Sequence, residues 1–266
     1  MKYIKLIFIF LSLLCFGCEN EELLNPELIY KQQVVVHCQI STGSYFPGVI
    51  LTRTLPLDVS FDIKIAEIKD ATMYLRIDGY KVIPLHYTQD GMYEPLYEFR
   101  AIENEHFELF GQWGEYSFYA ITKIPIKPVV NSVDINLSGY YSEADVTTFK
   151  GEVYSALWAV DQGTFVNAPD FYNVSVPETS SVNNTVRVRT ASYPIEYQSS
   201  AYNGRRYIRV YSFDGSFDDY FETKVQNEEI NNPNVQGSGN TIWNIQGENV
   251  IGMFIGMNKS DYLPVN

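Results

Sequence analysis

Residues 72–79, TMYLRIDG, contain the pattern that decides the fold. Met73, Leu75 and Ile77 occupy every second position, so in an extended chain their side chains lie on one face. Asp78-Gly79 follows directly, and such a pair readily adopts the positive φ angles of a tight turn between two strands. The segment therefore predicts a half-buried strand that opens a β-hairpin.

Short β-rich runs of the same kind recur along the chain, with a second Asp-Gly turn at residues 90–91. Clusters of Gly, Asn, Ser and Pro separate them, which is typical of all-β sandwiches and barrels. No repeat of roughly 20 to 50 residues indicates a propeller or solenoid. The expected strands are 49–53, 72–77, 116–122, 132–138, 151–160, 171–176, 184–190, 205–213, 241–245 and 249–257.

One segment has a helical period instead. Phe217, Phe221 and Val225 stand four residues apart between Ser216 and Ile230, and Asn231-Asn232-Pro233 follows. We expect a single amphipathic helix near 216–230, with Ser216 as its N-cap.

Two prolines, Pro125 and Pro128, predict a domain boundary, because proline cannot donate to a strand ladder. A chain of 266 residues suits one large or two ordinary domains. We therefore expect an all-β fold with two β-rich domains, residues 30–128 and residues 129–266, and place the helix in the second.

The N-terminus indicates export. The apolar run at residues 7–14, IFIFLSLL, follows two lysines and is shorter than the ~20 residues that a spanning helix needs. Gly17-Cys18 resembles the lipobox of bacterial lipoproteins, although Cys15 stands where leucine is usual. We expect residues 1–17 to be removed as a signal peptide and Cys18 to carry a lipid that anchors the protein to a membrane. The alternative is an ordinary cleaved signal with an incidental cysteine.

Residues 18–29 are polar and predict an acidic tether. Glu19-Asn20-Glu21-Glu22 follows the expected anchor and resembles the surface-export signal of Bacteroidetes lipoproteins. That resemblance implies an outer-membrane protein that faces the cell exterior, while a plain solvated linker is compatible with the same residues.

The charge balance excludes one class of partner. The chain has 32 acidic and 19 basic side chains, a net charge of −13, and loss of the two lysines before residue 18 leaves −15. Without a basic block, the protein has no electrostatic footprint for a phosphate backbone, so we expect no nucleic-acid partner.

Cys38 is the one cysteine beyond Cys18. Strand alternation places it on an apolar face with Val36 and Ile40, which favours a buried core thiol over a reactive one.

The sequence shows no constellation of catalytic or metal-binding residues. His37, His86 and His106 lack metal-ligand spacing, and no G-x-S-x-G motif is present. Asp218-Asp219 and Glu228-Glu229 are adjacent pairs, whose side chains diverge by ~100° on a helix. We expect no catalytic residue, no metal site and no cofactor.

Five tyrosines fall in polar, turn-like stretches, where their large and stiff side chains suit protein binding or glycan stacking. The alternative is that they occupy half-buried strand faces, where aromatic residues are common. The tyrosines are Tyr140, Tyr141, Tyr193, Tyr197 and Tyr202.

Several short motifs occur in a recognisable order. They are Val34-Val35-Val36, Leu51-Thr52-Arg53-Thr54, Asp70-Ala71, Asp90-Gly91-Met92-Tyr93, Gly114-Glu115-Tyr116, Thr122-Lys123-Ile124-Pro125, Asn244-Ile245 and Ile251-Gly252-Met253-Phe254-Ile255-Gly256. In order and spacing they resemble the Bacteroidetes lipoproteins gathered as domain-of-unknown-function family 4249, over nearly the whole mature chain. The sequence departs from the family at Met253, where an aromatic residue is commoner.

The resemblance implies a lipid-anchored surface protein. It makes residues 30–128 an immunoglobulin-like sandwich and residues 129–266 a larger antiparallel β-sandwich or barrel-like domain. Members are often encoded beside TonB-dependent outer-membrane receptors, and the resemblance assigns no catalytic residue.

We therefore expect a non-enzymatic accessory or binding subunit that works with an outer-membrane β-barrel receptor of the TonB-dependent kind. One alternative is a fimbrillin-like adhesin that polymerises by donor-strand exchange. No Arg or Lys lies between residues 32 and 52, so the sequence does not support trypsin-like maturation there. A surface hydrolase is the less favoured third class.

Overall fold

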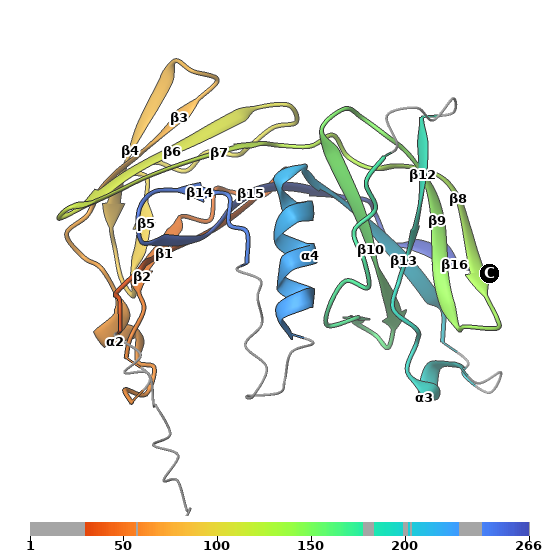
Figure 1. Cartoon of the computed structure of the whole chain (residues 1–266). Coiled ribbons are helices and arrows are strands. Elements are labelled where there is room, and N and C mark those ends of the chain that lie inside the picture. The colour runs from red at the N-terminus through yellow and green to blue at the C-terminus, as the bar shows by residue number, and fades with distance from the viewer. Residues whose placement is uncertain are drawn as a thin grey trace, which may run out of the picture. The chain divides into compact units, whose positions relative to one another are not determined.

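The computed structural model describes residues 30–56, 58–177, 184–198, 202, 204–228 and 241–265. Contacts between Cα atoms group the chain into Met1–Lys31 and Gln32–Asn266, and the second unit contains every helix and strand described below. The described residues form sixteen strands and three helices, which confirms the all-β prediction (Figure 1). Among the described residues, no helix is long and apolar enough to cross a membrane.

The strands at 49–53 and 72–77 have the bounds that the sequence predicted, whereas 171–176 contains only an isolated bridge, between Ser175 and Tyr154. The elements are β1 (Val34–Ser41), β2 (Val49–Arg53), α2 (Ile63–Ala66), β3 (Thr72–Ile77), β4 (Lys81–Tyr87), β5 (Met92–Glu94), β6 (His106–Trp113), β7 (Tyr116–Lys123), β8 (Val129–Asn136), β9 (Tyr141–Thr147), β10 (Glu152–Asp161), β11 (Phe165–Asn167), β12 (Thr185–Arg189), α3 (Ile195–Gln198), β13 (Arg206–Asp214), α4 (Ser216–Glu228), β14 (Ile245–Gln246), β15 (Val250–Lys259) and β16 (Leu263–Val265).

The predicted helix is α4, but its cap differs from the expected one. Asp214 Oδ1 accepts hydrogen bonds from the backbone N–H of Ser216, at 3.1 Å, and from its hydroxyl, at 2.8 Å. Ser216 is therefore the first helical residue, and the acidic side chain two residues earlier holds the start of the helix.

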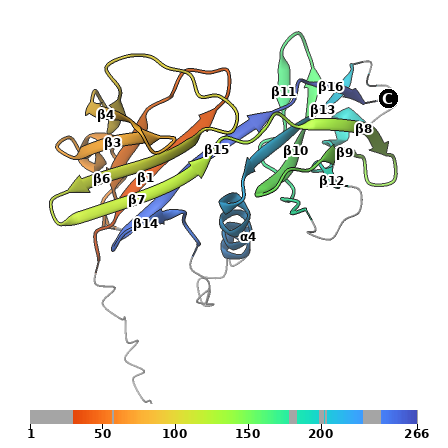
Figure 2. The same cartoon turned by 90° about the horizontal axis from the view of Figure 1, so that it is seen from above.

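Two sheets contain the strands. The larger has thirteen strands in the order β11-β10-β13-β15-β1-β2-β5-β4-β3-β6-β7-β14, with β16 beside β13, and the smaller has the order β12-β9-β8. β15 lies in the middle of the larger sheet, parallel to β1 and antiparallel to β13. Figure 2 shows β15 running from the strands of the first half to those of the second. The first and last long strands of the unit are thus neighbours.

β15 carries buried side chains on both faces. Val250 and Phe254 belong to the core under β1, β3 and β6, whereas Met253, Ile255 and Met257 pack with residues of β13 and α4. A strand that is covered on both sides has a nearly continuous apolar sequence, as this one does. β15 therefore lies between two hydrophobic cores and contributes side chains to both.

Gly252 allows β15 to approach β1. Its φ is 125°, and a Cβ atom built at this position would lie 1.9 Å from the carbonyl oxygen of Val36. A residue with a side chain does not fit between the two backbones.

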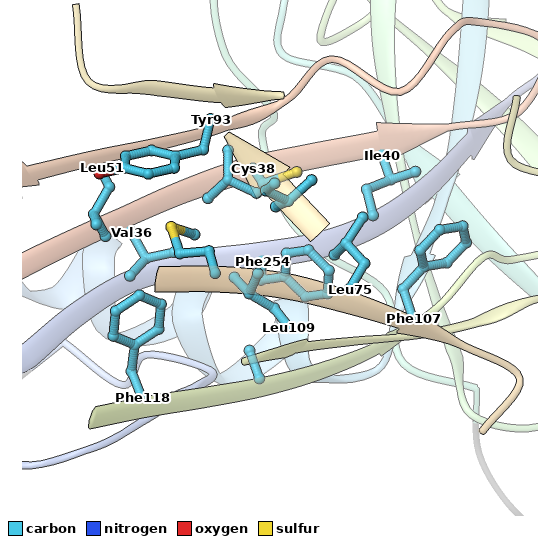
Figure 3. Close-up of a cluster of buried hydrophobic side chains, with 14 of the residues drawn as sticks. Val36, Cys38, Ile40, Leu51, Leu75, Tyr93, Phe107, Leu109, Phe118 and Phe254 are labelled. Carbon is cyan, nitrogen blue, oxygen red and sulfur yellow. The ribbon is translucent and has the colours of Figure 1, made fainter. Parts of the chain in front are cut away.

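The first core fills the space between the layers of the N-terminal strands (Figure 3). Cys38 lies in it with 2% of its surface exposed, and burial raises the pKa of its thiol, which confirms the prediction of a core cysteine. The labelled members are Val36, Cys38, Ile40, Leu51, Leu75, Tyr93, Phe107, Leu109, Phe118 and Phe254.

The boundary predicted near residue 128 falls between β7 and β8. Strands from both sides of it belong to the larger sheet, and residues 32–266 form one compact unit. The division into 30–128 and 129–266 stays a prediction, and the signal and tether at residues 1–17 and 18–29 lie outside the described residues.

A buried carboxylate ties the segment before β3 to β4. The Glu67 side chain is fully buried, the Tyr87 hydroxyl donates a hydrogen bond to it, and Lys69 Nζ lies 2.9 Å from its Oε1. The hydrogen bond from Tyr87 and then the contact with Lys69 lower the pKa of Glu67 to about 2.

This lowered pKa predicts a pH-dependent contribution to stability. Because the folded state holds Glu67 ionised below its ordinary pKa of about 4.3, the contribution is full above that value and disappears as the pH falls toward about 2. Urea unfolding of the wild type and of Glu67→Gln should therefore differ most at pH 6 and converge toward pH 2. A difference that is constant over this range would contradict the assignment.

Candidate functional site

An open cavity of about 600 Å³ lies at the end of the smaller sheet, where the β8–β9 turn meets α3 and the start of β13. Its described lining residues are Ile135, Leu137, Tyr140, Tyr193, Ile195, Tyr197, Gln198 and Arg206. Three of the five predicted tyrosines line it, and we call it the tyrosine pocket.

The β8–β9 turn has a conformation that its asparagine fixes. Asn136 Oδ1 accepts hydrogen bonds from the backbone N–H groups of Ser138, at 3.1 Å, and Gly139, at 3.0 Å. Tyr140 follows with a φ of 50°, a left-handed conformation that is uncommon for tyrosine. This local geometry presents Leu137 and Tyr140 at the rim of the pocket.

Tyr193 forms the floor. Its side chain is 2% exposed, its ring centroid lies 5.5 Å from that of Trp158, and its hydroxyl lies 2.7 Å from the Ser142 hydroxyl. Burial raises the pKa of Tyr193 to about 12, so the phenol is neutral at physiological pH. Because Tyr193 is so deeply packed, it shapes the floor of the pocket but exposes little surface that a large ligand could contact.

Arg206 and its aromatic neighbours form one wall. The guanidinium donates from Nε to the Tyr197 carbonyl oxygen, at 2.8 Å, and its central carbon lies 5.3 Å from the Tyr202 ring centroid. The Tyr197 and Tyr202 rings meet edge to face at 5.2 Å. These contacts hold the cation beside apolar surface, an arrangement that favours cation–π interactions.

The structure places Tyr141 elsewhere. Its ring lies 3.9 Å from the guanidinium carbon of Arg189, which stacks on the Tyr172 ring at the same distance. Because successive side chains of a strand alternate, Tyr141 points away from the face on which Ser142 and Tyr193 meet. Tyr140, Tyr193, Tyr197 and Tyr202 are thus brought together, and Tyr141 is not among them.

The rim contains the residues that sequence reasoning missed. Ile195 is 83% exposed and Leu137 is 69% exposed, on either side of Tyr140 at 39%. Large apolar side chains that cluster in solvent mark interaction surfaces. In the sequence, each of these residues is a single apolar residue in a turn-like stretch. Such a residue does not indicate a binding surface unless the fold is known.

The pocket offers contact surface and hydrogen bonds. Among the described residues that line it, Arg206 is the one charged side chain, and Gln198 Nε2 donates to the Tyr193 carbonyl oxygen at 2.6 Å. Such a site can bind an apolar or aromatic group next to a cation, the composition of a protein-binding hot spot.

The other candidate groups lie apart from the pocket. His37, His86 and His106 are all exposed, and no three His, Cys, Asp or Glu residues of the described chain cluster as metal ligands would. At the end of β13, Asp214 Oδ2 accepts a hydrogen bond from the Lys123 backbone N–H at 2.8 Å, so both oxygens of this carboxylate accept from backbone N–H groups. Asp218 is half-buried while Asp219 is exposed, as expected for neighbours that diverge on a helix.

The chain matches a protein-family model. A family model described as a domain of unknown function, DUF4249, matches residues 21–262. A search of the curated proteins found no match.

Proposed function

We propose that this chain, which belongs to the DUF4249 family, is a lipid-anchored binding protein of the outer-membrane surface. We further propose that it is the accessory subunit of a TonB-dependent receptor, which it contacts through the tyrosine pocket. Cys18 would carry the lipid, and the acidic residues after it would direct the protein to the cell exterior.

The exposed rim of the tyrosine pocket supports a binding role most directly. Leu137, Tyr140 and Ile195 line an open cavity together with the buried Tyr193 and with Arg206, so a protruding apolar side chain of a partner would lose part of its contact with water there. Aromatic residues and arginine are the side chains that dominate binding energy in protein interfaces. An extracellular loop of a barrel receptor could supply such a side chain.

The adhesin alternative stays a prediction with less support. β1 pairs with β2 on one side and with β15 on the other, so both of its edges are occupied. Donor-strand exchange that begins at the first strand would have to break the parallel ladder with β15 as well.

We expect an Ile195→Asp exchange to weaken binding of the proposed receptor. A charged side chain at the rim of the tyrosine pocket would oppose the removal of water that binding requires. The amount of barrel receptor that co-purifies from detergent-solubilised outer membranes should therefore fall about tenfold or more. Leu96→Asp is the matched control, because Leu96 is 82% exposed and Ile195 is 83% exposed. Quantitative mass spectrometry of both preparations measures the effect.

The anchor is tested in the same preparations. Cys18→Ser should move the protein from the membrane fraction to the soluble fraction. A membrane-bound Cys18→Ser variant would refute the anchor, and equal receptor recovery with Ile195→Asp and Leu96→Asp would refute the role of the pocket.

A further inference from the structure

Three apolar side chains project into solvent from residues 58–65. Phe61 is 74% exposed, Ile65 is 46% exposed and Val59 is 38% exposed. The segment runs into α2, whose single buried residue is Ala66, and Asp62 caps the helix by accepting from the Lys64 backbone N–H at 2.9 Å. Of the three exposed side chains, Ile65 lies in the helix, whereas Val59 and Phe61 precede it.

The segment lies where the chain enters the fold. The backbone N–H of Gln33 donates to Thr54 Oγ1 at 3.0 Å, and the Gln33 carbonyl accepts from the Thr54 backbone N–H at 2.9 Å. The neighbouring Arg53 donates from Nε and Nη2 to the Ile65 carbonyl, at 3.2 and 3.0 Å. Hydrogen bonds thus connect Gln33 to the exposed apolar segment through two consecutive residues.

The length of the chain before Gln33 limits how far this end can be from a lipid on Cys18. Fourteen residues lie between the two positions. A fully extended chain of that length spans at most about 50 Å, so a lipid on Cys18 lies within that distance of Gln33.

The charges around the segment add no electrostatic attraction to a bilayer, so the apolar side chains would have to provide the contact. Lys64 pairs with Asp90, and Lys69 pairs with Glu67. Asp58 and Asp62 are exposed beside the apolar side chains. In an interfacial segment the apolar tips enter the acyl boundary while such polar groups stay among the headgroups.

We propose that Val59, Phe61 and Ile65 insert into the surface of the bilayer that holds the anchor, and that they fix this end of the protein on the membrane. The inference rests on the proposed lipidation of Cys18. It adds a second contact, and a single lipid chain benefits from a second contact of this kind.

The test uses tryptophan at two exposed aromatic positions. Phe61→Trp reports on the segment, and Tyr80→Trp is the control, because Tyr80 is 79% exposed in the β3–β4 turn, which Figure 1 shows at the opposite end from α2. Each lipidated variant is reconstituted into phosphatidylcholine–phosphatidylglycerol vesicles that contain doxyl-labelled acyl chains. After subtraction of the wild-type signal, we expect a blue shift and strong quenching of the added tryptophan in Phe61→Trp and neither effect in Tyr80→Trp.

A second preparation separates this inference from the proposed function. The chain from Cys18 onward is coupled through that thiol to a maleimide lipid; Cys38 is 2% exposed and does not compete. Quenching of the added tryptophan in the coupled Phe61→Trp chain supports insertion even if cells do not lipidate Cys18. An unquenched tryptophan in that chain, or equal quenching in the Phe61→Trp and Tyr80→Trp chains, overturns the inference. The inference is also overturned if the Phe61→Trp indole is shielded from water only when the receptor is present.

Discussion

Replacing Gly252 with alanine is expected to destabilise the protein by about 4 kcal/mol or more, which is a large part of the stability of a typical domain. The added Cβ would meet the Val36 carbonyl oxygen at 1.9 Å and the Val36 backbone nitrogen and carbon at 2.8 Å. Because these are backbone atoms inside a ladder, relief requires that β1 and β15 separate. Urea unfolding followed by circular dichroism measures the loss.

Gly163→Ala is the control for this exchange. Gly163 has a φ of 89°, and a Cβ atom there would meet no atom within 4 Å. Alanine at Gly163 therefore carries only the conformational penalty of a positive φ, about 1 kcal/mol. Equal destabilisation by the two exchanges would show that the contact with Val36 is not the cause.

Phe254→Ala is expected to cost about 3–5 kcal/mol, because the ring is fully buried and its removal leaves a cavity in the first core. Met253 is 6% exposed and faces α4 from the other side of the strand. Met253→Ala should therefore loosen α4, whereas Phe254→Ala should loosen β3 and β6. Native-state hydrogen exchange distinguishes these regions.

The pair of exchanges also tests whether β15 separates two cores. Faster exchange in both regions with either variant would mean that the two sides unfold as one unit. Faster hydrogen exchange that is confined to α4 for Met253→Ala, and to the first core for Phe254→Ala, would confirm that β15 separates two cores.

Local features of the fold followed from sequence, and distant pairings did not. The alternation at residues 72–77 and the turn at Asp78-Gly79 are confirmed, with φ angles of 49° and 77°. These features depend on neighbouring residues. The position of β15 depends on Val34 pairing with Val250, and no pattern within either segment identifies the other.

The same distinction applies to the tyrosine pocket. The sequence singled out five tyrosines in turn-like stretches, and the structure brings four of them together. Strand alternation is enough to predict that Tyr140 and Tyr141 point in different directions. That Arg206 and Ile195 also line the pocket depends on how the chain runs between α3 and β13, which the sequence pattern does not show. Whether the pocket binds a partner stays a prediction.

The pairing of β1 with β15 has a consequence for secretion. More than 200 residues separate Val34 from Val250, so β1 keeps one open edge until β15 has been synthesised. Contacts of such long range form slowly. A chain with the expected signal peptide would therefore remain unfolded and fit for translocation while it crosses the inner membrane. The sheet around β1 would be completed only after β15 has emerged.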